Sequence, residues 1–225
     1  MKGPRSPAAR RALELYAEAP AGARLHTAVR WWTAPFAALE LEVPLAGPVL
    51  EVGCGHGLFS AYLALAGRAR HVVGTDIDGD KIAVARAAAR RLRPGEADLR
   101  FEVGDGAVPR IDGGWRSIVL ADVLYLLGGT GRRAMLDDCV AALAPGGLLV
   151  VKEVDTRPRW KALLATVQEL AATRVVRITE GSEVDFAEPR ELAAHLEALG
   201  CTTMVKRLDH GYPHPHCLVL ATAPA

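Results

Sequence analysis

Residues 49–57 read VLEVGCGHG, an apolar run that passes directly into three glycines with the spacing G-x-G-x-G. A short apolar run of this kind is typical of a buried strand, and a helical pattern over 58–65 follows the glycines. Glycine permits a positive φ and lets a ligand touch the backbone. Because the first strand–helix turn of an open α/β sheet lies at its ligand-binding crevice, this stretch predicts a cofactor-binding turn.

A carboxylate follows the next predicted strand. The apolar run 71–75 ends at Asp76, 23 positions after Gly53. An acidic side chain at about this separation can hydrogen-bond both hydroxyls of a ribose, whereas pyrophosphate-binding turns have the spacing G-x-G-x-x-G. Glu51, just inside the first strand, would repel a phosphate but could hold an ammonium group. The pattern therefore favours a ligand with an amino acid at one end and a ribose at the other.

The alternation of strand-like and helical segments predicts the fold class. Buried strands are expected at 48–52, 71–75, 117–121 and 148–151, and a strand nearer the edge at 99–103. Helices are expected at 58–65, 79–92 and 132–143; Asp78 would cap the second, and glycines 146–147 would end the third in a tight turn. Such alternation indicates a parallel sheet with helices on both faces.

The two ends of the chain differ from this central pattern. Residues 1–46 predict short helices that form a cap rather than an independent domain, and 47–225 would form the main domain. The tail predicts helices at 160–172 and 189–199, a ribbon or lid at 174–186, and antiparallel strands at 202–208 and 217–222. The whole is expected to be an α/β, Rossmann-like open sheet, mostly parallel with a C-terminal antiparallel hairpin, and with an N-terminal helical cap.

Composition excludes several classes of protein. The 27 Lys and Arg and 26 Asp and Glu among the 225 residues give a net charge of +1, which argues against a basic nucleic-acid-binding coat. None of the four cysteines forms a C-x-x-C pair, so buried free thiols are expected. No secretory leader is apparent, and no apolar run approaches the roughly 18 residues of a membrane span. We therefore expect a cytoplasmic protein.

Five segments in register resemble a known family. Residues 51–57 (EVGCGHG), 75–78 (TDID), 102–107 (EVGDGA), 120–125 (LADVLY) and 143–148 (LAPGGL) resemble, in order, the motifs of class I S-adenosylmethionine-dependent methyltransferases. The resemblance covers about 48–155. It implies S-adenosyl-L-methionine as the cofactor and methyl transfer as the activity.

Carried over residue by residue, the resemblance implies two groups of cofactor-binding residues. At the methionine end, Gly53 and Gly55 would pass the backbone beneath the ligand, while Glu51 and the Ala121 carbonyl would bind its ammonium group. At the nucleoside end the roles would be shared by Asp76 on the ribose hydroxyls, Ile77 packed on adenine, and Asp105 with Gly106 at the adenine amino group. Simpler alternatives are that Asp105 only stabilises a turn and that Ile77 is ordinary core.

The catalytic residues are less clearly indicated. An oxygen or nitrogen acceptor needs a base of near-neutral pKa, and we consider His56, Tyr125 and Asp122, each of which could instead be structural. The histidines at 210, 214 and 216 would be excluded if their connection lies at the far end of the strands. We expect no metal: a magnesium site from Asp122, Glu153 and Asp155 is a weak alternative, since the family's metal-binding pattern is not matched.

The acceptor is suggested by aromatic residues in the cap. Arg30, Trp31 and Trp32 precede Phe36, and a roof with two tryptophans would suit an apolar or planar acceptor, although one tryptophan could be core and the other surface. The predicted function is methyl transfer to a small, fairly apolar metabolite, with oxygen favoured. Alternatives are a protein or lipid acceptor, or a non-catalytic S-adenosylmethionine-binding module. Nucleic acid is not expected as a partner, and the oligomeric state is open.

Overall fold

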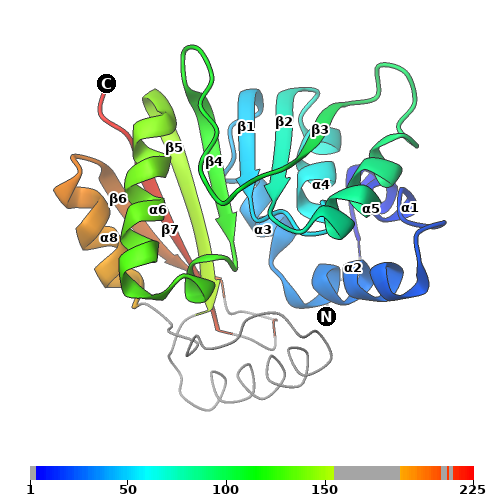
Figure 1. The fold of residues 1–225 in the computed structure, drawn as a ribbon, viewed down its shortest axis with the longest axis horizontal. Helices are drawn as coiled ribbons and strands as arrows, with labels where there is room; N and C mark the ends of the chain where they lie inside the picture. The colour runs from blue at the N-terminus through cyan, green and yellow to red at the C-terminus, as the bar shows by residue number, and fades with distance from the viewer. Residues whose placement is uncertain (1–3, 155–187, 209–211, 213–214) are drawn as a thin grey trace.

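A twisted sheet forms the centre of the computed structural model, which describes residues 4–154, 188–208, 212 and 215–225. In this part of the chain the sheet has seven strands in the order β3-β2-β1-β4-β5-β7-β6 (Figure 1). The strands are β1 (Ala46–Val52), β2 (Ala69–Asp76), β3 (Asp98–Val103), β4 (Trp115–Ala121), β5 (Leu143–Val154), β6 (Thr202–Arg207) and β7 (His216–Thr222). The first five pair in parallel, and β7 pairs antiparallel with both β5 and β6.

The order of the strands decides where a ligand can bind. The chain runs from β1 to β2 and β3 on one side, and then returns to β4 and β5 on the other. This reversal opens a crevice outside the carboxyl ends of β1 and β4. The predicted fold class is confirmed, including the antiparallel hairpin and the edge position of β3.

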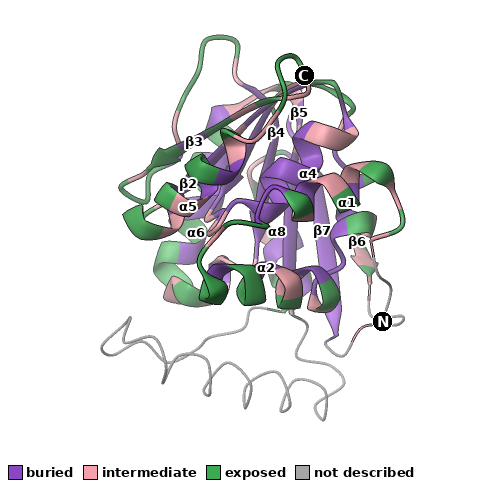
Figure 2. Cartoon of the chain, turned by 90° about the vertical axis from the view of Figure 1, so that its right-hand side faces the viewer, coloured by how far each residue is buried: buried purple, intermediate pink, exposed green. Residues whose placement is uncertain are grey.

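The helices cover both faces of the sheet. Successive strand residues point to opposite faces, so Val49 joins a core with α1 (Pro7–Glu14), α3 (Phe36–Glu40) and α4 (Leu58–Ala66), while Leu50 joins one with α6 (Gly128–Ala142) and α8 (Pro189–Ala198). Helix α5 (Gly79–Ala89) packs against β2 and β3. The buried strands lie between these helices in Figure 2.

The N-terminal segment is joined firmly to the rest of the chain. Ala9 and Ala12 of α1 are buried in the same core as α4. Arg70 of β2 is fully buried and donates to the Glu40 carboxylate at 2.8 Å and to the Val43 carbonyl oxygen at 2.6 Å. These contacts fit a cap that shares the core of the main domain; the division at residue 46 stays a prediction.

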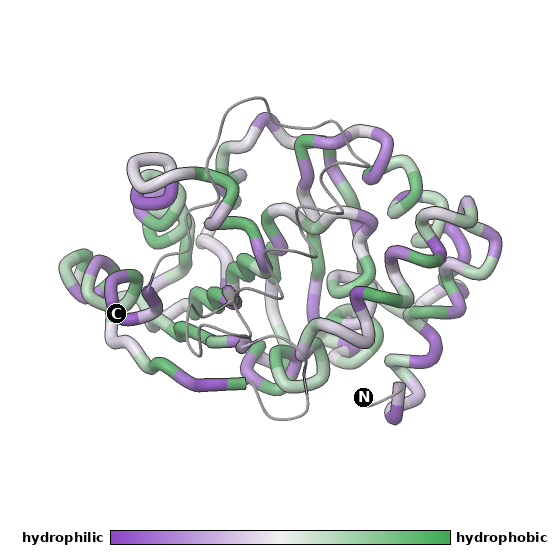
Figure 3. The backbone as a smooth tube through the Cα atoms, turned by 90° about the horizontal axis from the view of Figure 1, so that it is seen from below, coloured by the Kyte–Doolittle hydropathy of each residue, from purple (hydrophilic) through white to green (hydrophobic). Residues whose placement is uncertain are grey.

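Helix α2 (Ala21–Thr33) lies across the carboxyl ends of β1 and β2 in both views (Figures 1 and 2). Hydrophobic and hydrophilic residues alternate along the outer helices (Figure 3). Among the described residues, none of the helices combines the length and the hydropathy of a membrane span. All four cysteines are buried free thiols, as predicted.

Two details of the predicted elements are wrong. Helix α6 begins at Gly128, four residues early, because packing of its later residues Met135 and Leu136 outweighs the poor helix propensity of the glycines. Glycines 146 and 147 do not end that helix but lie within β5, where Gly146 N–H donates to the Pro224 carbonyl oxygen at 3.0 Å.

The cap by Asp78 is confirmed, since its carboxylate accepts from the backbone N–H groups of Asp80 and Lys81. The predicted elements at 160–172 and 174–186 lie outside the described residues.

Candidate functional site

The glycine turn after β1 is shaped by close neighbours on two sides and is open on a third. Gly53, Gly55 and Gly57 all have positive φ, at 72°, 56° and 78°. A Cβ on Gly53 would lie 2.5 Å from Val123, and one on Gly57 would lie 2.4 Å from the Phe101 ring. A Cβ on Gly55 would meet no heavy atom within 4 Å, so the backbone there is accessible to a ligand.

Asp76 lies directly beside this turn. Its Oδ2 accepts a hydrogen bond of 2.7 Å from the Gly55 N–H, and its Oδ1 accepts one of 2.9 Å from the Asp78 N–H. The next residue, Ile77, is 70% exposed, so the alternative that it is ordinary core is wrong. An acidic group therefore ends β2 at the crevice and an exposed apolar side chain follows it; their roles toward a ribose and an adenine stay predictions.

The third predicted segment has a defined turn. Asp105 is exposed and its Oδ1 accepts from the Ala107 N–H at 2.9 Å, which is the turn-stabilising contact considered above. Gly106 has a φ of 97° and open space around it. The Gly104 N–H donates to the Asp76 carbonyl oxygen at 2.9 Å, which brings this turn beside the ribose-binding candidate. The adenine-binding role of Asp105 and Gly106 stays a prediction.

Glu51 presents a buried carboxyl group at the same crevice. It is 3% exposed and accepts a short hydrogen bond from the Ser60 hydroxyl. Burial raises the pKa of Glu51 to about 7, although the Ser60 hydrogen bond and the Arg30 charge oppose this shift. A buried carboxylate is costly without a cation or further donors. The group therefore fits a ligand that brings an ammonium, and Ala121, which ends β4, is the matching carbonyl candidate.

Asp122 is at the centre of a charged cluster that the sequence did not reveal. It is the single non-glycine residue with positive φ in the described part of the chain, at 63°. Its Oδ2 accepts from Arg30 Nη1 at 2.7 Å, and its Oδ1 accepts from the ammonium of Lys152, which is 1% exposed. Burial opposes ionisation, but the Lys152 and Arg30 charges hold the pKa of Asp122 far below its ordinary range. A carboxylate held this way is a poor proton acceptor.

Glu153 completes the cluster from β5. Its Oε1 accepts from the Val123 N–H at 3.2 Å and from the Leu124 N–H at 3.0 Å. Burial and the neighbouring Asp122 charge raise the pKa of Glu153 to about 8. Burial lowers the pKa of Lys152, which the Asp122 charge partly offsets. With Asp122 paired to two cations, the cluster does not have the donor set of a magnesium site, and Asp155 lies outside the described residues.

His56 lies in the glycine turn against a second histidine. Its ring centroid is 4.8 Å from that of His26 on α2, and its backbone carbonyl accepts from the Tyr16 hydroxyl at 2.6 Å. His56 Nδ1 is buried without a hydrogen-bond partner among the described residues. Partial burial lowers the pKa of both imidazoles, so both are neutral at pH 7. His26 was not among the predicted site residues; its position four residues before Arg30, on the same helix face, was the available signal.

The remaining candidates lie on the same side of the sheet. Tyr125 is half-buried in the short 3₁₀ turn Leu124–Leu126 that follows β4, and its hydroxyl interacts electrostatically with Arg30. His216 pairs with Val154 at the carboxyl end of β5, so the expectation that its connection could lie at the far end is wrong. Its Nε2 lies 2.7 Å from the Thr33 carbonyl oxygen, which ties β7 to the end of α2. His210 and His214 lie outside the described residues.

The two tryptophans of the cap have different roles. Trp31 is 5% exposed and packs edge-on against the Tyr62 ring at 5.1 Å, whereas Trp32 is 41% exposed. The expected roof with two tryptophans is wrong, and the alternative of one core and one surface residue is correct. Trp32 shares an exposed apolar side of α2 with Leu25 and Val29, at helical spacing.

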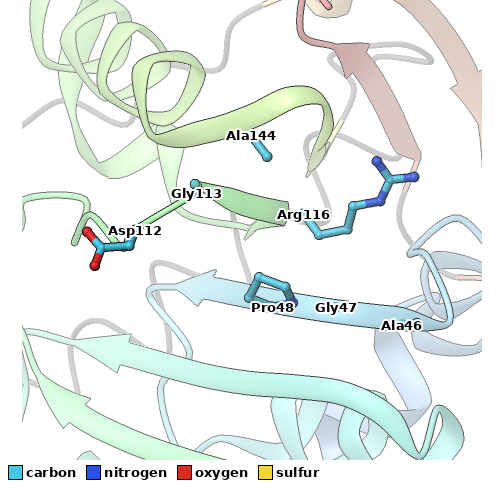
Figure 4. Close-up of a pocket in the computed structure, with 8 residues that line it drawn as sticks. Ala46, Gly47, Pro48, Asp112, Gly113, Arg116 and Ala144 are labelled. Carbon is cyan, nitrogen blue, oxygen red and sulfur yellow. The ribbon is translucent and has the colours of Figure 1, made fainter.

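A separate depression of about 470 Å³ lies at the opposite edge of the sheet (Figure 4). It is bordered by the start of β1, the glycines before β4, Arg116 and Ala144. These are the amino ends of the parallel strands, whereas ligands of open α/β sheets bind at the carboxyl ends. The depression is therefore not the cofactor site.

Comparisons with known proteins agree with this geometry. Residues 49–147 match the family described as Methyltransferase domain. The ubiquinone biosynthesis O-methyltransferase of Xylella fastidiosa is 32% identical over 164 residues, which cover 72% of this chain and 64% of that protein. The protein of the same name from Xanthomonas euvesicatoria is 29% identical over 186 residues, which cover 76% of this chain and 75% of that protein. These matches confirm the predicted resemblance to class I S-adenosylmethionine-dependent methyltransferases over the central part of the chain.

Solved structures support the same fold for this methyltransferase domain. Magnesium protoporphyrin IX methyltransferase from Synechocystis PCC 6803, solved with bound S-adenosylhomocysteine, superposes with a TM-score of 0.63 at 17% identity. The match covers 95% of this chain and 93% of that one. The chain spans only 64% of the length of the Xylella relative.

Proposed function

We propose that this chain transfers the methyl group of S-adenosylmethionine to an oxygen atom of a small, fairly apolar acceptor. The observation that carries the proposal is the combination, at one crevice, of the open backbone at Gly55, the buried carboxyl of Glu51 and the carboxylate of Asp76. These groups match the ammonium and ribose ends of the cofactor. The names of the relatives support oxygen as the acceptor atom.

Most of the site residues are proposed to bind the cofactor rather than to transfer a proton. Glu51 and the Ala121 carbonyl would hold the ammonium group, Gly53 and Gly55 would pass beneath the methionine end, and Asp76 would hold the ribose. The bound cofactor supplies an electrophilic methyl group on a sulfonium, so no covalent enzyme intermediate is needed. Alignment of the acceptor with that methyl group can contribute up to about 7–11 kcal/mol.

His56 is the proposed base. It lies in the cofactor turn and is neutral at pH 7 because partial burial lowers its pKa. Asp122 is the weaker candidate, since two cations lower its pKa and so make it a poor proton acceptor. Tyr125, which follows β4 at the same edge, is proposed to orient the acceptor. The exposed apolar side of α2 around Trp32 is proposed as a surface for an acceptor or its entry path.

The first test is calorimetric titration with S-adenosylhomocysteine, followed by assay of its formation from S-adenosylmethionine with phenols, carboxylates and amines as separate acceptor classes. Turnover with a hydroxyl-bearing class supports the proposal. Binding without turnover on any class would instead indicate a non-catalytic binding module. His56→Gln is expected to lower kcat by about 10²–10⁴-fold while leaving the affinity for S-adenosylhomocysteine within about threefold.

A further inference from the structure

Helix α2 places the ring of His26 against the glycine turn. The ring centroids of His26 and His56 are 4.8 Å apart, and the two ring planes are tilted by 49°. Aromatic rings in contact have centroids about 4.5–7 Å apart, so the two imidazoles pack against each other. His26 is exposed, whereas His56 is only partly exposed. The His26 ring therefore covers part of the proposed base from the side of the cap.

The backbone of His56 is held more firmly than its ring. The His56 carbonyl oxygen accepts from the buried Tyr16 hydroxyl at 2.6 Å. Its Nδ1 is buried without a hydrogen-bond partner among the described residues. A hydrogen bond to the second ring nitrogen is the usual means of orienting a catalytic histidine. Since the described part of the chain supplies no such bond to Nδ1, packing against His26 is the contact that can orient the ring.

Helix α2 is anchored on the far side of His26 from the start of the helix. Arg30 lies one turn after His26 on the same helix face and donates to Asp122 at the end of β4 at 2.7 Å. At the C-terminal end of the helix, the Thr33 carbonyl oxygen lies 2.7 Å from Nε2 of His216 in β7. The His26 ring is therefore presented to the turn by a helix that is tied to two strands of the sheet.

The surroundings of the two rings favour neutral imidazoles. The charged side chains that influence them are Arg30 on α2, Lys81 on α5, and Asp76 and Asp78 at and after the end of β2. Partial burial, the His56 ring and the two cations lower the pKa of His26 to about 4. Partial burial and Lys81 lower the pKa of His56, which the two carboxylates partly offset. Removal of the His26 ring would admit water to His56, which favours its charged form.

We propose that His26 is a positioning residue, whose ring holds the imidazole of His56 in one orientation at the glycine turn. This inference rests on the proposed function, in which His56 takes the proton of the acceptor. In this role His26 acts through the orientation and the solvation of His56 rather than on the acceptor itself. Because α2 supplies the ring, the efficiency of proton transfer also depends on how the cap is docked on the sheet.

A double-mutant cycle tests whether His26 acts through His56. His26→Ala should lower kcat by about tenfold and change the Kd of S-adenosylhomocysteine less than about threefold, because the base remains but is less well oriented. In the His56→Gln background the same substitution should leave kcat unchanged within about threefold, since the group that it positions is absent. His26→Phe keeps an aromatic ring and should restore kcat to within about threefold of the wild type.

NMR titration of the imidazole protons gives a second readout, which needs no acceptor. The pKa of His56 should rise in His26→Ala, because its ring gains solvent, and should stay near the wild-type value in His26→Phe. His71→Ala is the matched control. His71 is an exposed histidine of β2 that pairs with Asp98, and its removal should change neither kcat nor the pKa of His56.

The possible outcomes separate this role from others. An equal loss of kcat from His26→Ala with and without His56 would overturn the inference in favour of a structural role. A loss in His26→Phe as large as that in His26→Ala would also overturn it, because the ring nitrogens rather than the packing would then be required. Absence of turnover by the wild type would reject the proposed function, whereas an unchanged His56 pKa in His26→Ala would overturn this inference alone.

Discussion

The backbone N–H of Gly55 donates to Oδ2 of Asp76 across 2.7 Å, which joins the glycine turn after β1 to the acidic end of β2. The other oxygen of Asp76 accepts from the Asp78 N–H, so both carboxylate oxygens are held in place. The carboxylate is thereby oriented beside an open stretch of backbone before any ligand binds. Pre-organisation of this kind lowers the entropic cost of binding.

Replacing Asp76 by Ala is expected to weaken binding of S-adenosylhomocysteine by at least about tenfold, because charge-assisted hydrogen bonds to the ribose are lost. Isothermal titration measures this change. Asp78→Ala is the control: it removes the N-cap of α5 and should lower the free energy of unfolding by about 0.5–2 kcal/mol with little effect on the Kd. Equal Kd values for Asp76→Ala and the wild type would show that the ribose site is assigned to the wrong residue.

Gly55→Ala should abolish measurable cofactor binding while the protein still folds. The new Cβ would meet no protein atom within 4 Å but would project into the space reserved for the ligand. Gly95→Ala is a close control, because Gly95 also has a positive φ and open surroundings. Both substitutions should cost about 1–2 kcal/mol of stability from the left-handed backbone, as measured by urea unfolding. Normal binding by Gly55→Ala would contradict the proposed path of the ligand.

The affinity for S-adenosylhomocysteine should depend on the ionisation of Glu51. The pKa of Glu51 is about 7 in the unliganded protein, and an ammonium bound beside it would lower that value. Affinity should therefore rise about tenfold between pH 6 and pH 8 and then level off. Titrations in Glu51→Gln should give a weaker Kd that is independent of pH in this range. A wild-type Kd that is also independent of pH would show that the ammonium group does not bind to this carboxyl group.

Glu153 should make the fold less stable as the pH rises. Its pKa is raised to about 8 in the folded state, above the ordinary carboxyl value, so the folded state binds the proton more tightly. That contribution is complete below the unfolded pKa and is lost as the pH rises through 8. Between pH 6 and 8 the free energy of unfolding of the wild type should fall by roughly 2 kcal/mol more than that of Glu153→Gln. In this variant the amide oxygen can still accept from the Val123 and Leu124 N–H groups.

Urea unfolding at several pH values tests this prediction. The slope of stability against pH should be smaller for Glu153→Gln than for the wild type across this range. Lys206→Gln is a suitable control, since its salt bridge with Glu42 is partly exposed and outside the cluster. Parallel curves for Glu153→Gln and the wild type would show that Glu153 is already ionised in the folded protein.

Local patterns in the sequence were sufficient for the sheet and for the glycine turn after β1. The apolar run before Gly53, the carboxylate that ends the next strand and the cap at Asp78 depend on periodicity, glycine chemistry and short-range hydrogen bonds, all of which act within a few residues. The misplaced start of α6 shows the limit of this reasoning, because packing of later residues of the same helix against the core outweighed local propensity.

Only the tertiary structure decided how the cap meets the site. Arg30 and Asp122 are 92 positions apart, and the His26–His56 contact joins α2 to a turn on another element. Such pairs depend on how a helix docks on the sheet, which many long-range contacts determine together. The same docking buried Trp31 and left Trp32 exposed. Charge type and strand order can be inferred along the chain, but the ionisation of Glu51 and Asp122 depends on which distant groups surround them after folding.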